Sequence, residues 1–160
     1  MGKLQIGYIL FLECPNEVVM HVKSLGEIRF RKNMYVYVGS ANLRNPIARV
    51  LRHFSKCKKK HWHIDYLTEK CDPFLALLCF GCSEDHLYEM LESFNNVKPA
   101  VLGFGSTDKA PHKTHLFEVM HRGNQVIKFL FNTLVKTCDC VDVISVSREY
   151  CFSQALLIRP

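Results

Sequence analysis

The chain has 160 residues, of which 48% are hydrophobic, eight are glycine and six are proline. This length suits one domain with a sizeable core, and the composition excludes a disordered chain. The formal net charge is +6 with histidine neutral. Such an excess favours a polyanionic partner, nucleic acid first and an anionic membrane surface second. Because no segment reaches the roughly 18 apolar residues of a membrane span, a spanning protein is not expected.

The N-terminal apolar run, residues 4–12, is rich in β-formers and predicts a strand. Glu13 closes the run and no small-residue cleavage site follows, so we interpret it as a strand and not as a signal peptide. Residues 15–17 are typical of a turn, and residues 18–22 resume an extended pattern. We therefore expect a hairpin between the first strand and residues 18–22.

A further strand is expected over residues 34–38, after a short extended piece at 27–30. Because side chains alternate between the two faces of a strand, Tyr35 and Tyr37 should share one face. Gly39 follows shortly after and allows the backbone to bend at the strand end. The Tyr37 phenol is thereby expected near the start of the next element.

The clearest helix start is Asn45, which can cap a helix, followed by Pro46 in the first helical position. Apolar residues at helical spacing predict a buried stripe of Ile47, Val50, Leu51 and Phe54. Basic residues recur at the same spacing on the opposite face, namely Arg49, Arg52, His53 and Lys56. We therefore expect one packed face and one face free to meet phosphate, which a helix N-terminus also attracts.

Residues 44–60 contain seven basic side chains and no acidic one. Such a block is typical of a nucleic-acid-binding surface, although a solvated surface patch is the alternative. The candidate nucleic-acid-binding residues are Arg44, Arg52, Lys56, Lys58, Lys59 and Lys60.

Further along the chain, residues 62–67 alternate enough to predict a strand with His63 and Asp65 on one face. Residues 74–80 are apolar throughout and predict a buried strand or a core helix segment. A second helix should begin at residues 83–85. Its expected buried stripe is Leu87, Met90, Leu91 and Phe94.

A glycine-rich loop over residues 101–107 precedes a short strand over 115–120. A helix is then expected over 124–136, and short strands over 141–146 and 155–158. The buried stripe of this helix should be Val126, Phe129, Leu130 and Leu134. We interpret residues 1–118 as the main domain and residues 119–160 as a C-terminal extension packed on it.

The eight cysteines suggest reduced thiols in a cytoplasm, because no secretion signal accompanies them. Cys79 with Cys82 has the spacing of half a zinc site, and Cys138 with Cys140 forms a tighter pair. A structural zinc requires both pairs, or a histidine, to converge. Disulfide bonds remain the other alternative.

Several motifs resemble the GIY-YIG nuclease superfamily. They are Gly7-Tyr8-Ile9, the run at residues 37–41 (Tyr-Val-Gly-Ser-Ala), and the helix motif Arg49-x-x-Arg52-His53-Phe54. The chain is more closely similar to the Uri-type branch, through the stretches at residues 35–41, 61–67 (His-Trp-His-Ile-Asp-Tyr-Leu), 103–108 and 115–117. The resemblance covers roughly residues 4 to 118.

This resemblance implies an α+β fold with a small antiparallel or mixed sheet flanked by helices, and metal-dependent hydrolysis of phosphodiester bonds in DNA. Glu84 would hold one divalent cation, Mg²⁺ or Mn²⁺, with Glu89 or Asp65 as alternatives. Tyr37 or Tyr8 would be the base, and Arg49 would steady the phosphate.

Histidines complete the set of candidate site residues. By the same resemblance, His53 would relay a proton or bind phosphate. His63, which alternates with His61 on the expected strand, is a further candidate. Asp65 is then a second carboxylate or a partner for a histidine, and Asp108 with His115 can also line the site.

Two other functions fit the sequence. One is a catalytically inactive nucleic-acid-binding module of the same fold, recruited to a repair enzyme. The other is a zinc-stabilised interaction protein in which the cysteines and histidines matter most. Fold and activity are separate questions, because folds are reused with inactive sites.

Overall fold

The structure is a computed structural model that describes residues 4–22, 24–109, 111–145 and 156–158. Its strands form a seven-stranded sheet in the order β6-β7-β4-β1-β5-β8-β9, and each neighbouring pair is antiparallel. The bounds are β6 Val97–Pro99, β7 Leu116–Val119, β4 Asn33–Ser40, β1 Ile6–Cys14, β5 Asp72–Phe80, β8 Cys140–Ser145 and β9 Leu156–Ile158. The expected α+β fold is confirmed.

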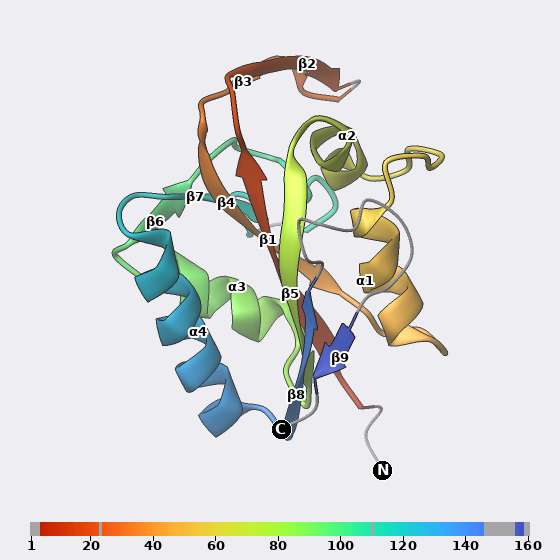
Figure 1. The fold of residues 1–160 in the computed structure, drawn as a ribbon, viewed down its shortest axis with the longest axis vertical. Helices are drawn as coiled ribbons and strands as arrows, with labels where there is room; N and C mark the ends of the chain where they lie inside the picture. Colours follow the sequence, from red (N-terminus) through yellow and green to blue (C-terminus); the bar gives the residue numbers. More distant parts are fainter. Residues whose placement is uncertain (1–3, 23, 110, 146–155, 159–160) are drawn as a thin grey trace.

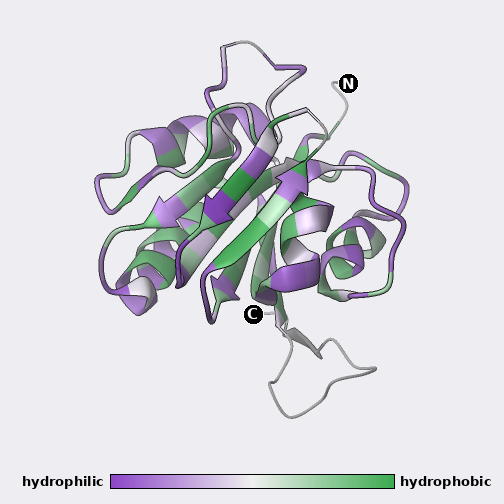
Figure 2. Cartoon of the chain, turned by 90° about the horizontal axis from the view of Figure 1, so that it is seen from above, coloured by the Kyte–Doolittle hydropathy of each residue, from purple (hydrophilic) through white to green (hydrophobic). Residues whose placement is uncertain are grey.

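Helices cover both faces of this sheet (Figure 1). Helices α1 (Pro46–Phe54) and α2 (His63–Lys70) lie on one face, and α3 (Glu84–Glu92) and α4 (Gly123–Thr137) lie on the other. Figure 2 shows hydrophobic residues gathered along the strands between the two helical layers, with polar residues on the surrounding loops. None of the described helices is long and apolar enough to cross a membrane.

Strand β1 is the centre of the molecule, between β4 and β5. Its side chains alternate between two cores, so that Tyr8 and Leu10 face the core that contains α1 and α2. Ile9 and Phe11 face the core that contains α3 and α4. Because both faces are covered, the strand reads as a continuous apolar run.

The predicted hairpin between the first strand and residues 18–22 is wrong. Strand β2 (Val18–Val22) instead pairs with β3 (Gly26–Phe30) in a separate two-stranded sheet. Both edges of β1 are already occupied, by β4 and β5, so no edge is left for β2. The extra pair lies at one end of the main sheet (Figure 1).

The predicted strand over residues 62–67 is also wrong, because these residues form most of α2. Its buried residues Ile64, Leu67 and Thr68 follow helical spacing and pack toward the core. The Asp65 carboxylate accepts hydrogen bonds from the backbone N–H groups of His61 and Trp62 (2.9 and 3.2 Å), which the helix leaves without internal partners. Local capping and burial thus favour the helix.

Helix α4 and strand β8 belong to the same core as α3. Val126, Leu130 and Leu134 are buried as predicted. Phe129 is 45% exposed, contrary to the prediction, and stacks on the partly buried Phe94 with ring centroids 4.2 Å apart. In α3, Tyr88 joins the buried residues where a stripe through Met90 was expected. The domain boundary after residue 118 remains a prediction.

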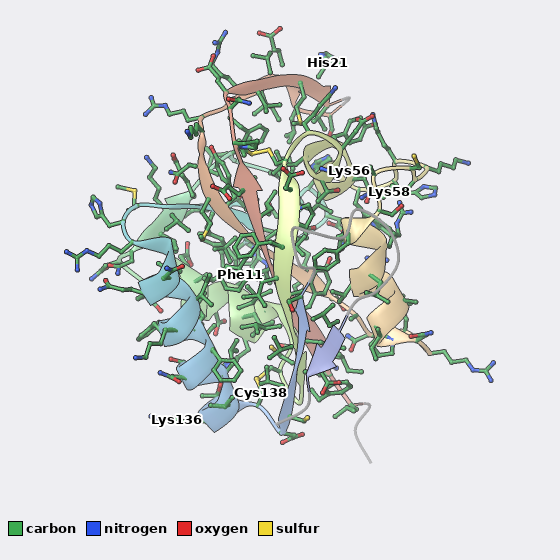
Figure 3. All side chains as sticks on the ribbon, in the orientation of Figure 1. Phe11, His21, Lys56, Lys58, Lys136 and Cys138 are labelled. Atoms are coloured by element: carbon green, nitrogen blue, oxygen red, sulfur yellow. A yellow bond between two sulfur atoms is a disulfide. The ribbon has the colours of Figure 1, made fainter. Side chains whose placement is uncertain are left out.

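Four cysteines form two disulfides, so the expectation of reduced thiols is wrong for these residues. Cys14 at the end of β1 is bonded to Cys71 at the end of α2, with Cα atoms 4.4 Å apart. Cys82 before α3 is bonded to Cys138, which Figure 3 shows at the end of α4. Both bonds join positions more than 50 residues apart, which sequence spacing could not reveal.

Candidate active site

The Tyr8 phenol lies against Gly39 on the neighbouring strand, where the two residues are paired in the register of β1 and β4. A Cβ atom at position 39 would lie only 2.3 Å from the Tyr8 hydroxyl oxygen. Strand β4 continues through this position to Ser40, so no bend accounts for the glycine. Gly39 is therefore needed for the close approach of the phenol.

Tyr8, Tyr37 and His53 form the centre of the site. The Tyr8 oxygen lies 2.7 Å from His53 Nε2. The Tyr37 ring centroid is 6.3 Å from that of Tyr8 and 6.4 Å from that of His53. Burial raises the pKa of both phenols well above their ordinary value. Both tyrosines are therefore neutral in this environment.

His53 is buried, whereas the sequence placed it on the solvent face of α1. It is only 1% exposed, while Leu51, predicted to be buried, is 36% exposed. His53 follows Val50 by three positions, so it lies on the same side of the helix and faces the sheet. Burial lowers its pKa to about 3, and the Asp65 carboxylate offsets only part of that effect. The imidazole is therefore neutral at physiological pH.

Asp65 lies behind His53 and is completely buried. Its Oδ2 atom accepts a hydrogen bond from the Arg52 guanidinium at 2.6 Å, in addition to the two backbone N–H groups at the start of α2. Burial alone would raise the pKa of Asp65, but these hydrogen bonds hold it below its ordinary value. Asp65 is therefore a buried carboxylate ion, and its neighbours do not form a metal site among the described residues.

Arg49 brings positive charge to the same place. Its guanidinium carbon lies 3.7 Å from the centroid of the Trp62 ring, which is 38% exposed. Its charge opposes the rise in the pKa of Tyr8, which places it beside the phenol. The Nε atom of Arg49 is buried without a hydrogen-bond partner among the described residues. A buried donor of this kind is satisfied by an acceptor such as a phosphate oxygen.

Glu84 reaches the site from the opposite layer, at the first position of α3. Gly7 permits this approach, because a Cβ atom there would lie 2.6 Å from a Leu87 methyl group and 3.3 Å from the Glu84 nitrogen. The charge of Glu84 contributes to the raised pKa values of Tyr8 and Tyr37. Glu84 therefore shares an electrostatic environment with the phenols.

Two residues from the loop before β7 bind Glu84. Lys109 Nζ lies 2.5 Å from Glu84 Oε2, and His115 Nδ1 lies 3.6 Å from Oε1. His112 supports His115 with a ring nitrogen contact of 2.9 Å. The sequence placed His115 in the site together with Asp108. In the structure Lys109, the residue after Asp108, forms the ion pair with Glu84. No sequence signal distinguished Lys109 from other loop lysines.

The donor set at Glu84 bears on the proposed divalent cation. The described residues contain no group of three or more histidine, cysteine, aspartate or glutamate side chains arranged to hold a metal. One carboxylate still suits Mg²⁺, which keeps several of its waters and is often held by one or two carboxylates. The Lys109 ammonium holds the same carboxylate, so the residues fit such an ion only where it displaces Lys109. Glu89, the alternative ligand, is exposed on α3.

The structure does not bring His63 to the phenols. Its Nδ1 atom accepts a hydrogen bond from the Gly105 backbone N–H (3.0 Å), and its Nε2 atom lies 2.6 Å from the Ser24 hydroxyl. Both ring nitrogens are thus used to join α2 to the loop before β7 and to the β2–β3 turn. His63 therefore joins these segments, and the catalytic role expected for it from the sequence stays a prediction.

Most of the basic block contacts the chain itself. Lys56 donates to the carbonyl oxygens of Thr68 and Cys71 at the end of α2, at 3.1 and 2.8 Å. Lys58 donates to the carbonyl oxygens of His53 and Ser55 at the end of α1, at 3.3 and 2.7 Å. Figure 3 shows both lysines beside these helix ends. They stabilise the helix ends, where cations are favourable.

The other four predicted nucleic-acid-binding residues fall into two pairs, one with ionic partners on the chain and one without any among the described residues. Arg52 is bonded to Asp65, and Lys60 forms an ion pair with Glu69 at 2.5 Å. Arg44 and Lys59 are exposed, and neither forms an ion pair within the part of the chain that the structure describes. The surface available to a polyanion is therefore smaller than the charge run predicts.

Comparison with known proteins gives a family and no individual relative. Residues 7–137 match the family described as Domain of unknown function DUF123. No curated protein and no solved structure matches the chain. The matched range includes all the residues of the site described above, from Tyr8 to His115.

Proposed function

The chain belongs to the DUF123 family, and on that premise we propose that it is a metal-dependent endonuclease of the GIY-YIG type, Uri branch, that hydrolyses phosphodiester bonds in DNA. The proposal also draws on the motif resemblance at Tyr8, Tyr37 and Arg49. The partners of the protein would be DNA and DNA-repair enzymes. The proposal keeps the cytoplasm as the location, where the two disulfides would be of the kind that intracellular proteins of hyperthermophiles retain.

One observation carries the proposal. The Arg49 guanidinium has a buried nitrogen without an acceptor, and it lies beside the Tyr8 phenol, which contacts His53 Nε2 at 2.7 Å. An anion at Arg49 would satisfy that nitrogen and would lie next to a group able to exchange a proton. A phosphodiester is such an anion, and its hydrolysis requires such a proton exchange.

In the proposed reaction, a proton of the attacking water leaves by way of Tyr8 and His53. Attacking water forms the new bond to phosphorus and gives a proton to the Tyr8 oxygen, while Tyr8 gives its own proton to His53 Nε2. Tyr8 acts by this exchange because burial disfavours a free phenolate. The phosphorus–oxygen bond to the leaving group breaks with its electron pair on oxygen, which takes a proton from solvent. Arg49 holds the phosphate during this exchange.

Glu84 would hold the divalent cation, which would take the place of the Lys109 ammonium at this carboxylate. When bound there, Mg²⁺ or Mn²⁺ would stabilise the negative charge that develops on the phosphate oxygens. Tyr37 lies on the same side of the sheet as Tyr8 and would orient the attacking water with its hydroxyl group.

The test is cleavage of labelled DNA substrates (single strands, duplexes, flaps and junctions) with Mg²⁺, Mn²⁺ or EDTA. Wild type is compared with Arg49→Ala and with Lys128→Ala, which removes one exposed positive charge from α4 on the opposite face of the sheet. We expect metal-dependent cleavage that Arg49→Ala abolishes and Lys128→Ala retains. Absence of cleavage by folded wild type on the whole panel would overturn the proposal.

A second candidate is the inactive nucleic-acid-binding module, which the Lys109–Glu84 ion pair favours because it blocks the metal ligand. This function predicts DNA binding that weakens with salt and does not respond to Mg²⁺. The zinc-stabilised alternative has lost support, because Cys82 and Cys138 are bonded to each other and do not join a shared cluster.

A further inference from the structure

Two buried polar atoms face each other behind the phenol. His53 Nδ1 and Asp65 Oδ1 are 4.0 Å apart. Neither has a hydrogen-bond partner among the described residues, and their side chains are 1% and 0% exposed. A buried polar atom without a partner costs free energy. We therefore expect the ring nitrogen and the carboxylate oxygen, a donor and an acceptor, to interact with each other.

The position of the ring proton follows from the Tyr8 contact. A neutral phenol donates its hydrogen to the acceptor nitrogen 2.7 Å away, which is His53 Nε2. In a neutral imidazole the proton is then on Nδ1, which faces Asp65. The Oδ2 atom of Asp65 is already occupied by Arg52, His61 and Trp62, and Oδ1 is left for the histidine.

We infer that Asp65 is a positioning residue, which holds His53 in the Nδ1–H tautomer so that Nε2 can take the proton of Tyr8. The inference rests on the proposed nuclease function for its chemical purpose, and it assigns a role to Asp65 that differs from metal binding. Asp65 itself receives no proton. One proton passes from water to Tyr8 and one from Tyr8 to His53, and the negative charge of Asp65, whose Oδ1 atom lies 4.0 Å from Nδ1, stabilises the imidazolium that results.

The charges around His53 explain why a carboxylate is needed there. Burial disfavours the imidazolium, and the cations Arg49, Arg52 and Lys58 disfavour it further. Asp65 is the neighbour that favours the protonated ring. A bound phosphodiester would add a second negative charge on the other side, which also favours proton transfer to His53.

Replacing Asp65 with asparagine gives a sharp expectation. The three donors at Oδ2 require an oxygen acceptor, so the amide oxygen must take that place and the amide NH₂ group must face His53. An NH₂ donor facing Nδ1 favours the other tautomer, with the proton on Nε2. The Nε2 proton would point at the Tyr8 oxygen, and the Tyr8 hydroxyl hydrogen would have no acceptor on His53.

The experiment records the protonation of the His53 ring nitrogens by two-bond ¹H–¹⁵N NMR at pH 7, with the signals assigned by their loss in His53→Gln. Wild type should carry its proton on Nδ1, and Asp65→Asn should carry it on Nε2. The control is Arg52→Gln, which breaks the same ion pair but leaves the carboxylate facing His53, and should retain the Nδ1 proton. An Nε2 proton in wild type, or the same tautomer in all three proteins, would overturn the inference.

Cleavage kinetics then separate this inference from the proposed function. Asp65→Asn should lower kcat by about a hundredfold or more and change KM little, as expected for loss of general base catalysis. The tautomer readout does not require activity, so wild type with the expected tautomer and no cleavage would refute the nuclease and not the positioning role. An Asp65→Asn protein that has the proton on Nε2 and still shows the full kcat would overturn the inference that proton transfer from Tyr8 to His53 depends on Asp65.

Discussion

Acidification should destabilise the folded chain through His53. The unfolded chain binds a proton at this residue below its ordinary pKa of about 6.5, whereas burial lowers the pKa in the folded state to about 3. Between these values the unfolded state binds more protons, so stability is complete above pH 6.5 and is lost as pH falls. Each pKa unit is worth about 1.4 kcal/mol. The two units between pH 6.5 and 4.5 therefore cost about 3 kcal/mol.

The assay is urea unfolding of wild type and His53→Gln at pH 7.5 and 4.5, with the disulfides kept oxidised. Glutamine cannot gain a proton in this range, so the variant should lose about 3 kcal/mol less than wild type between the two pH values. Asp65 stays ionised at pH 4.5 because its hydrogen bonds lower its pKa, so it does not obscure the comparison. Equal losses in both proteins would refute the reasoning that His53 is buried in its neutral form.

Three further predictions follow from contacts in or near the site. Gly39→Ala should lower the free energy of unfolding by about 2 kcal/mol or more, measured by urea titration, because the new methyl group collides with the Tyr8 phenol; an unchanged midpoint would contradict the close approach. Lys109→Ala should tighten Mn²⁺ binding in calorimetry by removing the competing ammonium, and equal affinities would refute the competition. Lys58→Met should cost about 1 kcal/mol through lost hydrogen bonds to carbonyl oxygens, whereas Lys59→Met should leave the thermal midpoint unchanged.

The central part of the fold was predictable because its signals are local. Strand β4 follows from its alternating pattern, and the start of α1 follows from the cap at Asn45 and the proline after it. Helical spacing gives three of the four core residues predicted for α4, namely Val126, Leu130 and Leu134. Helix α2 was missed because a window of six residues, 62–67, fits both alternation and helical spacing. The helix depends on Asp65, whose carboxylate accepts hydrogen bonds from the two backbone N–H groups before the helix and from Arg52 in α1.

The site was predictable in composition and not in geometry. The motifs pointed to Tyr8, Tyr37, Arg49 and His53, which the structure gathers in one place. Burial of His53 depends on Tyr8, 45 residues earlier, and no helical pattern contains that information. The role of the lysines depends in the same way on where two helices end, which only the folded chain defines.

The disulfide between Cys82 and Cys138 crosses the junction between residues 118 and 119 that divides the two predicted parts of the chain. A protease that cut the backbone near this junction would leave both fragments joined, and they would migrate as one species on a gel until reductant was added. A fragment ending at residue 118 would instead present an unpaired thiol at Cys82, two residues before Glu84. The last quarter of the sequence is thus tied covalently to the segment that carries the candidate metal ligand.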